Sequence, residues 1–183
     1  MDWTYPSTPA DRRADGIAEM ARRVVDEIGD SQLPGTRFTY DAREMLRATR
    51  EIEAAVRGGG RLWVGFQNAT KLDHEASRYA DLTASGAEVV AFGTGRPLRA
   101  GMSPRWIELE ASTVRLENQW FLVTTDPEPI AFVSWEVSDP ALFGVGGISA
   151  PEKEFVGFVT DDSRVIAALV SHLQAAAMAA DRS

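Results

Sequence analysis

The sequence contains no cysteine, and this absence excludes disulfide bonds, thiolate zinc sites and cysteine nucleophiles. A bilin held through a thioether and a flavin–cysteinyl adduct are excluded for the same reason, so the identity of any cofactor stays open. The absence of cysteine fits a reducing compartment, and we expect a cytoplasmic protein.

Histidine and lysine are almost as scarce. The two histidines, His74 and His172, stand far apart, whereas a zinc or iron site needs three or four convergent ligands, so no metal site is predicted. No Gly-x-Ser-x-Gly motif and no serine with an evident histidine partner occurs, so no catalytic residue is assigned. Lys71 and Lys153 are the only lysines, which we interpret as a coding bias.

Long apolar runs and an excess of basic residues are also missing. No stretch of 18 apolar residues occurs, and the first residues lack the apolar core of a signal peptide, so no membrane association is expected. The 19 basic and 27 acidic residues give a net charge of −8, which argues against direct nucleic-acid binding. With 183 residues, 44% of them hydrophobic, the chain suits one domain with a substantial core.

The periodicity of the first third predicts helices. Residues 1–9 are expected to form a flexible arm, and residues 10–35 an amphipathic helix over 10–28 followed by a connector. A second helix is expected from Asp41, with Glu44 completing a capping box, and Gly58–Gly60 should end it. A phosphate loop would instead follow a strand, open a helix and contain a lysine.

The rest of the chain predicts an α+β domain with a mixed sheet of about five to six strands. Residues 61–92 read as a βαβ unit with parallel strands, its helix beginning at Asp73, and residues 119–137 as an antiparallel hairpin. Short strands are expected over 106–109 and 155–160, and Asp161 or Asp162 should cap a C-terminal helix. Helices would then flank the sheet from both ends of the chain.

Aromatic residues are concentrated on the predicted strands. Four of the five tryptophans fall there, and both faces of the 119–137 hairpin are largely apolar. This pattern fits a sheet covered by helices on both sides, or an aromatic small-molecule pocket for which Gln67 and Glu136 could supply polar contacts. Residues 93–97, with Arg96, read as a flexible connection or as a phosphate-binding turn.

Several short motifs resemble the DICT domain, a sensory domain named for diguanylate cyclases and two-component systems. The resemblance covers about residues 40–175, in the order Glu51–Glu53, Leu62–Gln67, Tyr79, Val89–Gly93, Gln119–Val123, Ala131, Glu136 and a final strand and helix. It implies a domain over residues 36–180 that acts in bacterial signalling, either by binding a small ligand or by relaying a signal. Such domains occur beside histidine-kinase, cyclic-di-nucleotide and MerR-type DNA-binding modules, and also alone.

From the resemblance and the aromatic pattern we expect a sensory module without its own output domain, so its signal should pass through a partner protein. The candidate ligand-binding residues are Trp63, Phe66, Gln67, Tyr79, Phe92, Gly93, Trp120, Trp135 and Glu136.

Two other functions stay open. One is a protein-interaction adaptor with no ligand, and the other is a small enzyme that uses Glu136 or His74 as acid or base.

The helix over 10–28 either packs on its own domain or pairs with a second copy. We expect the pairing, and therefore a homodimer.

Overall fold

The computed structural model describes residues 35–39, 41–98, 104–109, 119–142 and 145–181. The expected arm over 1–9, the helix over 10–28 and nearly all of its connector lie outside the described residues. The domain limits and the homodimer therefore stay predictions.

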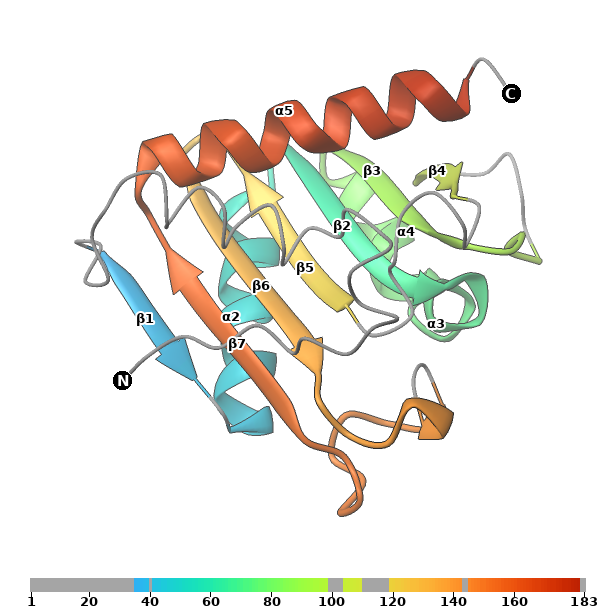
Figure 1. The fold of residues 1–183 in the computed structure, drawn as a ribbon. Coiled ribbons are helices and arrows are strands. Elements are labelled where there is room, and N and C mark those ends of the chain that lie inside the picture. The colour runs from blue at the N-terminus through green and yellow to red at the C-terminus, as the bar shows by residue number, and fades with distance from the viewer. Residues whose placement is uncertain (1–34, 40, 99–103, 110–118, 143–144, 182–183) are drawn as a thin grey trace.

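A seven-stranded mixed sheet forms the centre of the described structure, with strand order β1-β7-β6-β5-β2-β3-β4 (Figure 1). β2 and β3 are parallel, as are β3 and β4, and the other neighbouring strands are antiparallel. In chain order the strands are β1 (Thr36–Thr39), β2 (Gly60–Asn68), β3 (Ala87–Thr94), β4 (Arg105–Glu108), β5 (Gln119–Thr124), β6 (Ile130–Glu136) and β7 (Phe155–Thr160).

Helices cover both faces of this sheet. Seen in Figure 1, α2 (Ala42–Ala55), α3 (Ala69–His74) and α4 (Ala76–Ala84) lie behind it, and α5 (Ser163–Ala180) crosses in front. A short 3-10 helix, Pro140–Leu142, lies between β6 and β7. The α+β class, the βαβ unit and the antiparallel hairpin are thus confirmed.

The strand count is higher than the expected five to six, because β1 was not predicted. Its four residues are too few to show an alternating pattern, and the strand is defined by antiparallel pairing with β7, from Thr36 opposite Thr160 to Thr39 opposite Gly157.

The crossover of the βαβ unit contains two helices where the sequence predicted one. Asn68 caps α3 by accepting from the Lys71 amide, and the chain bends at Glu75 before α4. Asp73, the expected cap, instead accepts from the backbone N–H of Leu98, at 3.1 Å. The cap was misassigned because an acidic residue inside a short helix looks the same in sequence as one that begins a helix.

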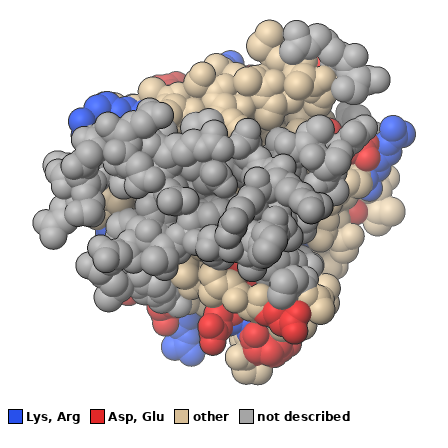
Figure 2. All heavy atoms as spheres, viewed as in Figure 1, with Lys and Arg blue, Asp and Glu red and all other residues tan. Residues whose placement is uncertain are grey.

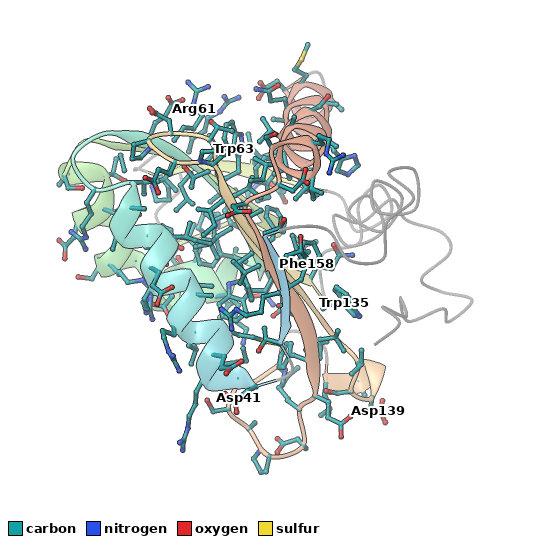
Figure 3. The ribbon with its side chains drawn as sticks, turned by 90° about the vertical axis from the view of Figure 1, so that its left-hand side faces the viewer. Asp41, Arg61, Trp63, Trp135, Asp139 and Phe158 are labelled. Atoms are coloured by element: carbon teal, nitrogen blue, oxygen red, sulfur yellow. The ribbon has the colours of Figure 1, made fainter. Side chains whose placement is uncertain are left out.

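The alternation of side chains along each strand separates two cores. Trp63, Phe121, Trp135 and Phe158 belong to the core under α5, whereas Phe66, Leu122 and Phe132 belong to the core under α2, α3 and α4. Figure 3 views the sheet nearly edge-on, with α2 on one side and α5 on the other. Neighbouring residues of one strand therefore belong to different cores.

The apolar face of α5 covers one side of the sheet with Val165, Ile166, Leu169 and Leu173. By length and hydropathy alone this helix meets the criterion for a membrane span, a composition that core helices share. Figure 2 shows its outer surface, along the top of the view, with few charged side chains.

Side-chain caps fix where α2 and α5 begin. Asp41 accepts from the amides of Arg43 and Glu44, as predicted, but the Glu44 carboxylate accepts from the Thr39 hydroxyl and not from the Asp41 amide. Asp162, one of the two expected caps, begins α5. Gly58, Gly59 and Gly60 all have positive φ; the first two lie between α2 and β2, and Gly60 begins β2, so the glycines follow the end of the helix as predicted.

Close packing at the centre of the sheet predicts that Gly65→Ala destabilises the fold. A Cβ at Gly65 would lie 2.1 Å from Cε1 of Phe121 on β5, so the ring or the strand must move. We expect the free energy of unfolding, measured by urea denaturation, to fall by about 1–3 kcal/mol. Gly147→Ala is the matched control, since a Cβ there meets nothing within 4 Å. Equal stability of the two variants would contradict the packing.

The cap of α5 predicts a stability that depends on pH. Hydrogen bonds from Arg164 and the Val165 amide lower the pKa of Asp162 from 3.8 to about 2, against an opposing effect of burial. The ionised carboxylate therefore stabilises the fold above about pH 4, and this contribution is lost as pH falls towards 2. At neutral pH, Asp162→Ala should cost about 1 kcal/mol in urea denaturation.

The difference in free energy of unfolding between the native chain and Asp162→Ala should shrink as pH falls from 4 to 2. Asp162→Asn keeps a cap oxygen but does not titrate. It should therefore lower the free energy of unfolding by less than Asp162→Ala does, and the difference between these two variants should not change with pH. A constant difference between the native chain and Asp162→Ala over that pH range would show that the charge of Asp162 is not involved.

Candidate functional site

A cavity of about 620 Å³ lies on the face of the sheet that α2, α3 and α4 cover. It adjoins the end of β2, and in open α/β sheets ligands bind outside the carboxyl ends of strands. Its walls come from α2, the end of β2, α3, α4, β5, the segment before β7 and the first residue of β7. The lining residues are Leu46, Thr49, Arg50, Glu53, Phe66, Gln67, Asn68, Thr70, Lys71, His74, Glu75, Arg78, Tyr79, Trp120, Gly146, Gly147, Ile148, Lys153 and Phe155.

One end of the cavity is organised around the carboxylate of Glu53 on α2, whose side chain is only 8% exposed. The Tyr79 hydroxyl donates to Oε1 at 2.8 Å, and Arg50 donates to Oε2 at 3.0 Å. Nε of Arg78 lies 3.2 Å from Oε2, and Arg78 also pairs with Glu75. The charges at this end of the cavity are thus balanced, and the network ties α2 to α4.

Burial, followed by the charge of Glu53, raises the pKa of Tyr79 well above its ordinary value of 10.0. The ring of Phe66 packs edge-on against Tyr79, with ring centroids 4.9 Å apart. Tyr79 therefore stays protonated and acts as a fixed hydrogen-bond donor to Glu53.

A second charged group consists of Lys153, which lines the cavity, and Glu136, which is buried behind its wall and pairs with Lys153. Lys153 Nζ lies 3.0 Å from Oε1 and 3.2 Å from Oε2 of Glu136, and it donates to the Leu142 carbonyl at 2.9 Å. The two side chains are 3% and 0% exposed. Removing one partner of a buried pair leaves an uncompensated charge, so loss of either side chain would strongly destabilise the fold.

Lys71 on α3 also lines the cavity, and its amine donates to the Gly146 carbonyl. Burial, followed by the charge of Lys153, lowers the pKa of Lys71 below 10.5, and Glu136 partly offsets this. The described residues place no carboxylate in ion-pair contact with Lys71.

Gln67 marks an irregular end of β2. Its φ is +61°, and it is the one described residue besides glycines with positive φ. The register of β2 against β3 shifts between Gly65 and Asn68. Left-handed backbone at a residue other than glycine is strained, and such strain clusters at functional sites. Here it places the end of β2 along the cavity wall.

The structure brings four of the nine candidate ligand-binding residues to the cavity: Phe66, Gln67, Tyr79 and Trp120. Glu136 lies behind its wall, paired with Lys153. Trp63, Phe92 and Trp135 lie in the core under α5, on the opposite face of the sheet. Gly93 makes room for the ring of Trp106, which a Cβ would approach to 2.5 Å.

Sequence reasoning missed the charged residues of the cavity as site residues: Arg50, Glu53, Lys71, Glu75, Arg78 and Lys153. A signal was present in the rarity of lysine, because the chain's two lysines, far apart in sequence, both line this one cavity. A coding bias explains why lysines are few, but it does not explain why both of them lie at this cavity. For Glu53, the signal was a carboxylate beside Ile52, on the apolar side of a predicted helix.

The other candidate sites have little support in the described residues. No group of three histidine or acidic side chains that could hold a metal ion occurs there. Arg96, the candidate phosphate contact, is 84% exposed and pairs with Glu108 at 3.0 Å. His74 lines the cavity, but Glu136 does not.

The comparison with protein families finds one match. The model of DICT, described as a sensory domain in diguanylate cyclases and two-component systems, matches residues 22–134. The match begins within the helix expected over 10–28 and ends in β6, so β7 and α5 lie beyond it. No curated protein matches.

Solved structures show distant similarity. NucT from Helicobacter pylori has a TM-score of 0.47 and 11% identity, over 76% of this chain and 92% of that one. TrmBL2, an archaeal chromatin protein, has a TM-score of 0.42 and 10% identity, over 86% of this chain and 57% of that one.

The Glu53 network predicts how Tyr79 titrates. Because Tyr79 is buried beside a carboxylate, it should ionise above the pH at which an exposed tyrosine does, and the stability it contributes should fall as pH rises above 10. The measurement is the absorbance of tyrosinate during an alkaline titration of the native chain, and Tyr79→Phe identifies the contribution of Tyr79.

Glu53→Gln keeps the shape of the side chain and removes its charge. The pKa of Tyr79 should therefore fall towards its ordinary value, but only partly, because burial also raises it. Tyr79→Phe should also lower the free energy of unfolding at neutral pH by about 1–3 kcal/mol, because Glu53 loses a buried donor. If Tyr79 ionises at its ordinary pH in the folded native chain, the network does not form.

Proposed function

Because this chain belongs to the DICT family of sensory domains, we propose that it senses a small molecule bound in the cavity and relays the occupancy of that cavity to a partner protein. The observation that carries the proposal is the cavity itself, whose volume of about 620 Å³ suits a small ligand. Apolar walls from Phe66, Trp120, Ile148 and Phe155 surround a few convergent polar groups, which is the usual make-up of a ligand site.

The cavity favours a sensor over an adaptor without a ligand, since an adaptor would need only a sheet packed solid with aromatic side chains. The face under α5 has a cluster of buried aromatic side chains, whereas the face under α2 has the cavity beside α3.

An enzyme that uses Glu136 as acid or base is less well supported. Its carboxylate is fully buried and occupied by Lys153, and it does not reach the cavity surface. His74 lines the cavity, but the described residues assign it no carboxylate that would orient its ring, as acid–base catalysis commonly requires.

The segment between β6 and β7 is suited to relay occupancy. Lys153 binds the Leu142 carbonyl and Lys71 binds the Gly146 carbonyl, so two amines of the cavity hold the backbone of this segment. Gly146, Gly147 and Ile148 also form part of the cavity wall. A ligand that displaced either amine would change the position of a segment that also has an outer, exposed surface, and a partner protein could recognise that change.

Filling the cavity predicts loss of ligand binding. Leu46→Trp adds an indole where Leu46 lines the cavity. The neutral probe N-phenyl-1-naphthylamine becomes fluorescent in apolar surroundings, and we expect the native chain to enhance its fluorescence and Leu46→Trp to abolish most of that enhancement.

The control is Leu98→Trp, which makes the same kind of change at a side chain that is 90% exposed and outside the cavity. It should bind the probe like the native chain. Undiminished enhancement with Leu46→Trp would place the bound probe elsewhere and contradict a ligand site in this cavity.

A further inference from the structure

The charged residues around the cavity do not balance. Among the described residues, four cations line it, whereas three carboxylates stand within or directly behind its wall, in a chain whose net charge is −8. The cations are Arg50, Lys71, Arg78 and Lys153, and the carboxylates are Glu53, Glu75 and Glu136.

The imbalance is confined to one side chain. Arg50 and Arg78 pair with Glu53, and Arg78 also pairs with Glu75. Lys153 donates to Oε2 of Glu136 and to the Leu142 carbonyl, and its ammonium also lies 3.0 Å from Oε1 of Glu136. Lys71 has one acceptor recorded among the described residues, the Gly146 carbonyl, for an ammonium that carries three donors.

On these grounds, and resting on the proposed function, we propose that the natural ligand is an aromatic or apolar molecule with one anionic group, a carboxylate or phosphate, that Lys71 binds. Partial burial of an ammonium beside a second ammonium, as at Lys71, is unfavourable unless an anion accompanies it. The lowered pKa of Lys71 reflects that cost, and an anion at this position would remove it. The apolar part of the ligand would lie against Phe66, Trp120 and Phe155.

Three probes with one ring system test the charge requirement. 2-Naphthoate carries a carboxylate, 2-naphthyl phosphate carries a phosphate, and 2-naphthamide is a neutral molecule close in shape to the first. Isothermal titration calorimetry of the full chain at pH 7 gives a dissociation constant for each. We expect at least one anion to bind about 10-fold more tightly than the amide, the effect of one charge-assisted hydrogen bond. The tighter anion identifies the group.

Variants of Lys71 test whether this side chain is responsible for the preference for an anion. Lys71→Met keeps a side chain of similar length without the charge, and the preference for the anion over the amide should fall to near unity. Lys71→Arg restores a cation and should restore most of the preference. Arg57→Met, at an exposed position outside the cavity, changes the net charge equally and should leave the preference unchanged.

The outcomes separate this proposal from the one on which it rests. Equal affinity of the native chain for amide and anions would overturn the anionic ligand and leave the cavity a ligand site. A preference that persists in Lys71→Met would overturn the role of Lys71. Binding of none of the three probes, together with no enhancement of the neutral fluorescent probe, would overturn both proposals.

Discussion

Burial of the sheet on both faces is the constraint from which the rest of the structure follows. Successive side chains of each central strand point to opposite faces, and both faces require apolar side chains. Two adjacent residues of one strand therefore belong to different cores. Trp135 therefore packs under α5, while Glu136, the next residue, points to the face that α2 covers. The cavity can draw only on side chains of that second face, together with α2, α3, α4 and the segment before β7.

Charged groups on that second face are subject to a further constraint, because burial makes an unpaired ion costly. Glu53 accepts hydrogen bonds from Tyr79 and Arg50 and pairs with Arg78, and Glu136 pairs with Lys153. These pairs hold together elements that are distant in the sequence: α2 with α4, and β6 with the segment before β7. The same ion pairs thus stabilise the walls of the cavity and fix its charge. Among the described cations of this face, Lys71 alone has no carboxylate in ion-pair contact.

Much of the fold could be predicted from local patterns, because the signals were local. Asp41 and Asp162 cap helices, Gly58–Gly60 end one, and the alternation over β5 and β6 assigns Phe121 and Leu122 to opposite faces as expected. The same alternation already implied that Trp135 and Glu136 could not share one pocket. β1 could not be predicted in the same way, because four residues show no period and their partner, β7, stands near the other end of the chain.

The composition of the site was less accessible than the fold, because it depends on residues that the topology brings together. Nothing local distinguishes Lys71 or Lys153, yet their chemistry differs from that of the arginines that make up the other basic residues. Lys153 occupies a small buried space with three oxygens around Nζ, which suits a compact ammonium better than a planar guanidinium. Lys71 faces the cavity beside it, where a small, strongly hydrated charge gains most from an anion that replaces its water. Two lysines in an arginine-rich chain therefore have a physical explanation at this site, and composition alone could not supply it.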